Sequence, residues 1–486
     1  MNIYKLSQLV LFLLGLFLVF LSLLADYFGI SNPGWSFRQI KFLIYGGFLL
    51  LISSFFFLKP NLIRKLIDEL IGIFNSILQE KTDKILSIFL FLTTFILGIL
   101  FYKMVVRMDL YPFFYQFSGQ GIRGLGFLRE YSIFYGFFYS LSTVAIFLIL
   151  RNFLGKFLSI TGTIMIITSP LHIYNLIPSI MRDYAKAPFI LFTILLLICI
   201  ILKQNTRLRF LCLMSLIGIT IGLGSVFRKD IIIMFVPIII CIIIMQNFKK
   251  KIFFRNIFGF FLSLIFFLIT YTFMIVDNND DLNRGGFNAV AGLPNYFNYR
   301  MNIDETQNYV WSTSGYDTYT LAISNTQYIK DLQNKFTSEN DYDFYGRKQI
   351  NYWLTILTNF PADVLTRFYA SSLKIIEMPF MYNYLPFPSD NFLKYFYILR
   401  GKLNNFLVPF SLFFVIFSIT ILSTISLRIA LCFLFIILFL SGYPSIQFYG
   451  RHYFHLEIIS WGSFLFFLKI CIPKILNFIK FKKYNP

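Results

Sequence analysis

Charged residues gather at the ends of several apolar runs of this chain, where a charge beside a bilayer costs free energy. One cluster runs from Arg182 to Pro188, a second from Phe227 to Asp230, and a third from Gly450 to Glu457. Arginine can hold a phosphate through two parallel hydrogen bonds, and lysine adds a point charge. The clusters therefore favour binding of an anionic, lipid-linked substrate, although charges at such places also serve simply to anchor helices at the headgroups.

Asp109 opens the loop that follows the third apolar run, close to the bilayer, with Arg107 before it and Arg123 after it. A carboxylate there can act as general base on an acceptor hydroxyl, or can bind a divalent cation such as Mg²⁺ or Mn²⁺. With Asp183 as the second acid, Asp109 and Asp183 are the predicted catalytic residues and candidate metal ligands. The glycines from Gly119 to Gly126 form no dinucleotide-binding motif, because no strand precedes them.

His452 and His455 are two of only three histidines, and they lie beside Arg451. Histidine suits phosphate contact or proton transfer, and a zinc site is disfavoured because no cysteine is near. No motif of a serine hydrolase, a P-loop ATPase or a zinc protease is present. The candidate phosphate-binding residues are Arg123, Arg182, Lys186, Arg228, Lys229, Arg451, His452 and His455.

The composition requires a membrane to cover these apolar runs. The 486 residues are 57% hydrophobic and 20% aromatic, with a mean hydropathy of +0.69. A soluble domain cannot bury that much apolar surface. The net charge of +20 is explained by anionic headgroups and basic inner loops, so no nucleic-acid partner is expected.

The apolar runs near or above about 18 residues predict an all-α polytopic membrane protein with about twelve transmembrane helices. The predicted spans are Leu9–Ala25, Ile40–Leu58, Ile85–Tyr102, Tyr131–Leu150, Phe157–Tyr174, Ala187–Leu202, Phe210–Phe227, Ile231–Met245, Ile257–Ile275, Phe406–Leu422, Ile429–Gly442 and Phe454–Cys471. Lysine and arginine concentrate in alternate loops and in the C-terminal tail, which predicts that both termini are cytoplasmic. The three charged clusters and Asp109 then share the outer face.

Four segments follow from this topology. Residues 1–84 hold two spans and an amphipathic linker, between Pro60 and Lys84, that lies on the inner membrane surface. Residues 85–276 form the transmembrane core, and residues 405–486 form the last spans and a basic tail. Residues 277–404 form a polar, mostly helical, extracytoplasmic insert between the ninth and tenth spans, with helices predicted at Ile323–Phe336 and Tyr345–Leu357 and a helix start at Pro361.

Six short segments resemble membrane glycosyltransferases of the GT-C superfamily. They are Ser31–Ile40, Ser118–Gly136, Ser169–Asn175, Arg182–Phe189, Phe227–Asp230 and Gly450–Glu457. The resemblance implies a polyprenyl-phosphate-sugar donor, an acid in the first outer loop of the core, and often a second acid in the next outer loop. Asp109 and Asp183 match these places if the first two spans are an N-terminal addition. Asp26 follows the very first span and matches the usual layout instead.

The resemblance thus implies an enzyme of the plasma (inner) membrane that transfers a sugar at its periplasmic or extracellular side. Its partners would be a polyprenyl-phosphate-linked sugar and membrane lipid. Two other classes stay open. An O-antigen polymerase or ligase also needs arginines on the outer face and a large outer loop. A lipid flippase or transporter would instead carry charges in the middle of its spans and a repeated half.

Overall fold

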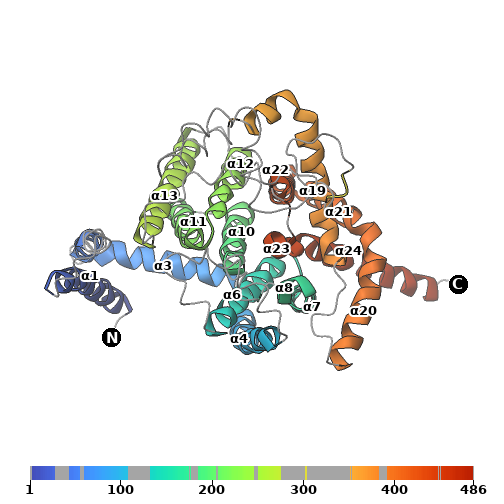
Figure 1. Ribbon diagram of the computed structural model, residues 1–486, viewed down its shortest axis with the longest axis horizontal. Coiled ribbons are helices and arrows are strands. Elements are labelled where there is room, and N and C mark those ends of the chain that lie inside the picture. The colour runs from blue at the N-terminus through green and yellow to red at the C-terminus, as the bar shows by residue number, and fades with distance from the viewer. Residues whose placement is uncertain are drawn as a thin grey trace, which may run out of the picture. The chain divides into compact units, whose positions relative to one another are not determined.

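The structure is a computed structural model (Figure 1). It describes residues 3–27, 43–54, 60–107, 132–174, 176, 184–203, 206–245, 250–274, 301–303, 351, 353–381, 391–446, 448 and 450–484. Every regular element within these ranges is an α-helix or a 3-10 helix. The predicted all-α class is therefore confirmed for the described part of the chain.

Seven of the described helical stretches are long and apolar enough to cross a membrane. They are Lys81–Lys103, Ser132–Arg151, Arg207–Phe227, Ile252–Thr272, Lys394–Ile425, Leu427–Ile446 and Phe454–Pro473. Large apolar side chains point outward along them: Ile85 and Ile88 are 70% and 62% exposed. Contiguous apolar surface of this kind is what a lipid environment covers. The protein is thus built as a membrane protein.

The other five predicted spans overlap helices that are not among these seven, so the twelve-span topology stays a prediction. The fifth is divided into α7 (Lys156–Ile167) and α8 (Pro170–Tyr174). Pro170 has no N–H to continue the helix, which is why the chain breaks just before it. The eighth begins as the 3-10 helix η3 (Lys229–Met234) and continues as α12 (Phe235–Met245).

The chain divides into two compact units, each assembled from three separate stretches of sequence. The first comprises Met1–Ile96, Phe114–Leu148 and Ala185–Asn278; the second comprises Leu97–Phe113, Ile149–Tyr184 and Asn279–Pro486. The described helices of the first unit are α1 (Ile3–Tyr27), α3 (Pro60–Ile77), most of α4 (Lys81–Arg107), most of α6 (Ser132–Arg151), α10 (Ala187–Leu202), α11 (Arg207–Phe227), η3, α12 and α13 (Lys250–Met274).

Small residues let α11 approach α13 closely, and these helices lie side by side in Figure 1. Gly218 and Gly222 are four positions apart on α11, the spacing that brings two membrane helices together. A Cβ at Gly218 would lie 2.1 Å from the carbonyl oxygen of Ser263, and one at Gly222 would lie 2.8 Å from Cβ of Thr270. On α13, a Cβ at Gly259 would lie 2.4 Å from the Phe210 ring.

The second unit gathers around α24 (Glu457–Tyr484), which packs on α7, α19 (Pro361–Met381) and α21 (Ser411–Ile425). The unit also contains α8, α20 (Asn391–Leu407), η5 (Val408–Phe410), α22 (Leu427–Gly442), η6 (Tyr443–Ile446), α23 (Gly450–Tyr453) and η7 (Phe454–Leu456). Serine hydroxyls join the helices: Ser460 donates to the Ile376 carbonyl at 2.6 Å, and Ser371 donates to the Ser441 carbonyl at 2.7 Å. In a membrane, lipid tails are as apolar as helix side chains, so burial of apolar side chains alone does not hold two helices together. Hydrogen bonds such as these add to the stability of the helix pairs.

Part of the predicted insert is described. α19 begins at Pro361, which confirms the predicted helix start. Residues 353–359 are helical, so they cover the end of the predicted Tyr345–Leu357 helix and continue two residues past it. The predicted boundary at residue 404 falls inside α20. The predicted helix Ile323–Phe336 lies outside the described residues.

Candidate functional site

Lys186, Arg228 and Asp230 meet in the first unit. Lys186 Nζ lies 3.0 Å from Asp230 Oδ2, and Arg228 Nε lies 3.1 Å from Asp230 Oδ1. Their side chains are only 1%, 14% and 18% exposed, in that order. One carboxylate is thus shared between two cations, and all three side chains are largely buried.

The order of the helices explains why these residues meet. Lys186 is the N-cap of α10, whereas Arg228 is the C-cap of α11 and Asp230 lies in η3 directly after it. Consecutive helices joined by a short loop run antiparallel, so the beginning of α10 lies beside the end of α11. Aromatic packing holds this end together, since the Phe189 and Phe227 rings stack with centroids 5.6 Å apart.

Two cations and one carboxylate meet in this cluster. A cation at a helix N-terminus is disfavoured by the helix dipole, and a nearly fully buried lysine needs an acidic partner to remain charged. Asp230 is such a partner of Lys186, and it also accepts a hydrogen bond from Arg228. Lys229 follows Arg228 directly in the sequence. Arginine and lysine are the side chains that hold phosphate groups in proteins.

Four predicted site residues, Asp109, Arg123, Arg182 and Asp183, lie outside the described residues. Arg451 lies in α23, but its side chain is also outside the described part. His452 and His455 are buried in the second unit, at 6% and 2% exposure. Of the predicted phosphate-binding residues, the structure therefore brings Lys186 and Arg228 together, through a shared carboxylate.

Position in the sequence places Lys186 near Asp183, which lies outside the described residues, and Arg228 near Asp230, which the structure confirms. The contact between Lys186 and Asp230, which spans 44 positions, was not predicted. The available signal was topological, because a predicted α10–α11 hairpin already places the two helix ends side by side. Arg400 and Ser169, which surround Glu457 in the second unit, were also not singled out.

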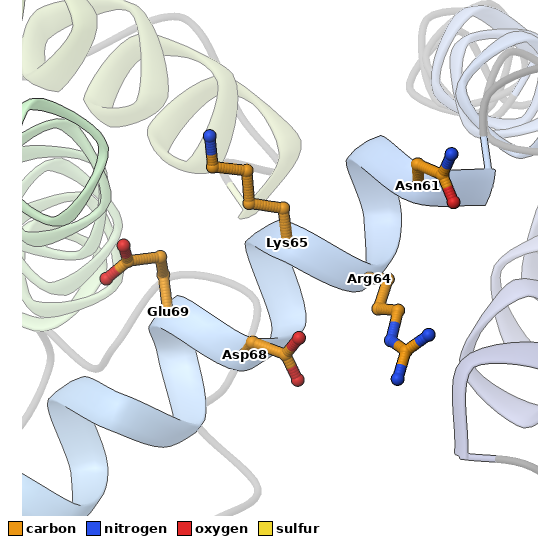
Figure 2. Close-up of a pocket in the computed structure, with 5 residues that line it drawn as sticks. All are labelled: Asn61, Arg64, Lys65, Asp68 and Glu69. Carbon is orange, nitrogen blue, oxygen red and sulfur yellow. The ribbon is translucent and has the colours of Figure 1, made fainter.

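A shallow surface depression of about 500 Å³ lies along α3, lined by Asn61, Arg64, Lys65, Asp68 and Glu69. Figure 2 shows Arg64 and Asp68 on one side of the helix and Lys65 and Glu69 on the other. Opposite charges four positions apart neutralise each other on a helix surface. The depression is therefore best explained as the polar face of the predicted amphipathic helix.

That helix is held by its neighbours within the first unit. Lys203 Nζ donates to the Ser76 carbonyl, and Arg209 donates to the Ser76 hydroxyl. On its opposite face Phe74 is 61% exposed and Leu70 is 41% exposed. Apolar side chains beside a charged face are typical of a helix that lies in a membrane interface.

Among the residues with described positions, no group of three histidine, cysteine or acidic side chains comes together to hold a metal ion. Asp109 and Asp183, the predicted metal ligands, lie outside those positions. A divalent metal at these two residues stays a prediction.

Comparison with known proteins adds no relative. No protein-family model matches the chain, and searches of curated proteins and of solved structures found no match either.

Proposed function

We propose that this protein is a GT-C-like membrane glycosyltransferase that moves a sugar from a polyprenyl-phosphate donor to an extracytoplasmic glycan, lipid or protein acceptor. In this proposal the chain crosses the plasma (inner) membrane about twelve times, with both termini in the cytoplasm and the polar insert outside. Lys186, Arg228 and Lys229 hold the donor phosphate, and Asp109 removes the proton from the acceptor hydroxyl. Asp183 orients the base or holds a metal.

The observation that carries the proposal is the buried ion-pair cluster of Lys186, Arg228 and Asp230 at the ends of apolar helices. In this cluster one carboxylate is shared by a lysine and an arginine, the two side-chain types that hold phosphate groups. Asp230 would keep both cations in place before the donor binds, so that a phosphate meets a preformed site. Preorganised charges of this kind stabilise negative charge more strongly than water does.

Arg228→Gln is expected to weaken binding of geranylgeranyl phosphate about tenfold or more, because a charged hydrogen bond to a phosphate contributes about 1.5–3 kcal/mol. Affinity would be measured by competition on the full-length protein in nanodiscs of phosphatidylethanolamine. Lys103→Gln, which removes an exposed cation of α4, is the matched control and should bind as wild type does. Equal affinities of Arg228→Gln and Lys103→Gln would contradict the phosphate-binding role.

Asp109→Asn is expected to abolish sugar transfer while leaving expression and geranylgeranyl-phosphate binding normal, because the amide cannot accept the proton of the acceptor hydroxyl. Surface glycans of a deletion strain complemented with wild-type or variant chain provide the readout. Loss of a single sugar supports a glycosyltransferase, and an altered chain length points to a polymerase or ligase. Glycan trapped inside the cell points to a transporter. Normal glycans with Asp109→Asn would remove Asp109 from the proposal.

A further inference from the structure

A second polar set lies in the interior of the second unit, where α8, α20 and α24 meet the break after α7. Ser169 Oγ donates to Glu457 Oε1 at 2.8 Å and accepts the backbone N–H of His172 at 3.2 Å. The His172 ring packs edge-on against Phe454, with centroids 4.7 Å apart. Glu457 begins α24, so the break between α7 and α8 is tied directly to the last long helix.

Arg400 reaches the same place from α20. Its Nη1 donates to the Met165 carbonyl at 2.7 Å and to the Thr168 hydroxyl at 3.1 Å. Tyr397 donates to the Thr168 carbonyl at 3.0 Å. The guanidinium lies 5.8 Å from the ring centroid of Trp461, and no hydrogen bond joins Arg400 to Glu457.

Several polar atoms of this set have no hydrogen-bond partner. They are Nε and Nη2 of Arg400, Oε2 of Glu457, both ring nitrogens of His172, and Nε1 of Trp461. The four side chains are 3%, 1%, 0% and 1% exposed, in that order. A buried polar atom without a hydrogen-bond partner destabilises the folded protein, and several such atoms lie together here. An occupant that satisfies these atoms removes that cost.

The arrangement of these atoms selects the chemistry of the occupant. Nε and Nη2 lie on the edge of the guanidinium that donates two parallel hydrogen bonds to a pair of oxygens. Glu457 Oε2 also needs a hydrogen-bond partner, and the indole N–H of Trp461 needs an acceptor. Two neighbouring hydroxyl groups meet these conditions without bringing a further charge into the interior, since each hydroxyl donates one hydrogen bond and accepts others.

We infer that Arg400, Glu457, His172 and Trp461 form a binding site for an uncharged ligand with two adjacent hydroxyl groups, such as a sugar ring or a glycerol group. Arg400 donates to both hydroxyl oxygens, and one of the hydroxyl groups forms a hydrogen bond with Glu457 Oε2. Trp461 and His172 complete the hydrogen bonds. The site is closed over in this structure, so binding includes a local opening of the surrounding helices. The inference does not depend on the proposed glycosyltransferase function.

Arg400→Lys and Glu457→Gln are each expected to weaken binding of a methyl glycoside about tenfold or more, because each removes hydrogen bonds to a charged group. Saturation-transfer NMR on the full-length protein in nanodiscs would follow titrations with methyl glucoside, methyl mannoside and glycerol. Stronger binding of a methyl glycoside would identify a sugar site, and stronger binding of glycerol would identify a site for a glycerol headgroup. No lipid-linked donor is present, so the result is independent of sugar transfer.

Arg428→Lys and Glu377→Gln make the same chemical changes elsewhere in the second unit and should bind as wild type does. Trp461→Phe keeps an aromatic ring, removes only the indole N–H donor, and should also weaken binding. This variant provides the test if Arg400→Lys and Glu457→Gln fail to fold. The inference is overturned if wild type binds neither glycoside nor glycerol saturably, which would mean that water alone fills the site. Unchanged affinity of the folded variants, or tighter binding of inorganic phosphate than of any diol, would overturn it equally.

Discussion

Replacing Gly218 with leucine is expected to separate α11 from α13 and to be among the most destabilising single changes in the first unit. The new Cβ alone would lie 2.1 Å from the Ser263 carbonyl oxygen. That oxygen belongs to the backbone of a helix, so it cannot move aside as the end of a long side chain can. We expect a loss at or above the upper end of the roughly 1–3 kcal/mol typical of overpacked interiors.

The measurement is the apparent melting temperature of the detergent-solubilised protein, with Gly218→Ala as an intermediate step. Gly72→Leu is the matched control, because no heavy atom lies within 4 Å of a Cβ built at Gly72. A melting temperature that falls in the order glycine, alanine, leucine at position 218, with little change at position 72, is the expected result. Equal changes at both positions would show that close approach of α11 and α13 contributes little to stability.

Asp230→Leu is expected to cost about 3–5 kcal/mol, because it leaves the nearly fully buried Lys186 without its carboxylate. Adding Lys186→Met should restore most of that loss, since replacing a buried ion pair by apolar side chains is often neutral. Geranylgeranyl-phosphate binding should stay weak in the double variant. Recovered stability without recovered binding would separate the structural contribution of the pair from its contribution to the ligand site.

Glu377→Gln is the control for this experiment. Glu377 lies 4.0 Å from Lys374 and is 32% exposed, so its loss should change stability by less than about 1 kcal/mol. If Asp230→Leu is no more destabilising than Glu377→Gln, the buried pair does not hold α10 to the end of α11. If the double variant binds the phosphate as well as wild type does, the cluster is structural only.

Hydropathy was sufficient to predict the helical class, because long apolar runs leave the backbone few other ways to satisfy its hydrogen bonds. Each predicted span overlaps a described helical stretch, and Pro361 was correctly predicted to begin a helix. The division of the fifth span after Thr168 was not predicted, although Ser169-Pro170 carries the signal. The residues on both sides of this break are apolar, so hydropathy alone does not reveal it.

The sites were less predictable, for a related reason. Lys186 and Asp230 are far apart in the sequence, and only the antiparallel packing of α10 and α11 joins them. Arg400 was placed within a polar insert, whereas α20 carries it to carbonyl groups that the break after α7 leaves open. Contacts of this kind depend on which helix lies beside which, and hydropathy does not determine that arrangement. The four-residue spacing of Gly218 and Gly222 is typical of a helix that packs closely on another, but it does not identify α13 as the partner.

The interleaving of the two units has a consequence for biosynthesis. When the ribosome reaches residue 278, every stretch of the first unit has been made, whereas α7 and α8 still lack α20 and α24. At that stage Ser169 and His172 would not yet be covered by α20 and α24. We expect nascent chains stopped near residue 278 to be recognised by membrane chaperones or quality-control proteases through this uncovered segment, and chains extended beyond α24 to escape them.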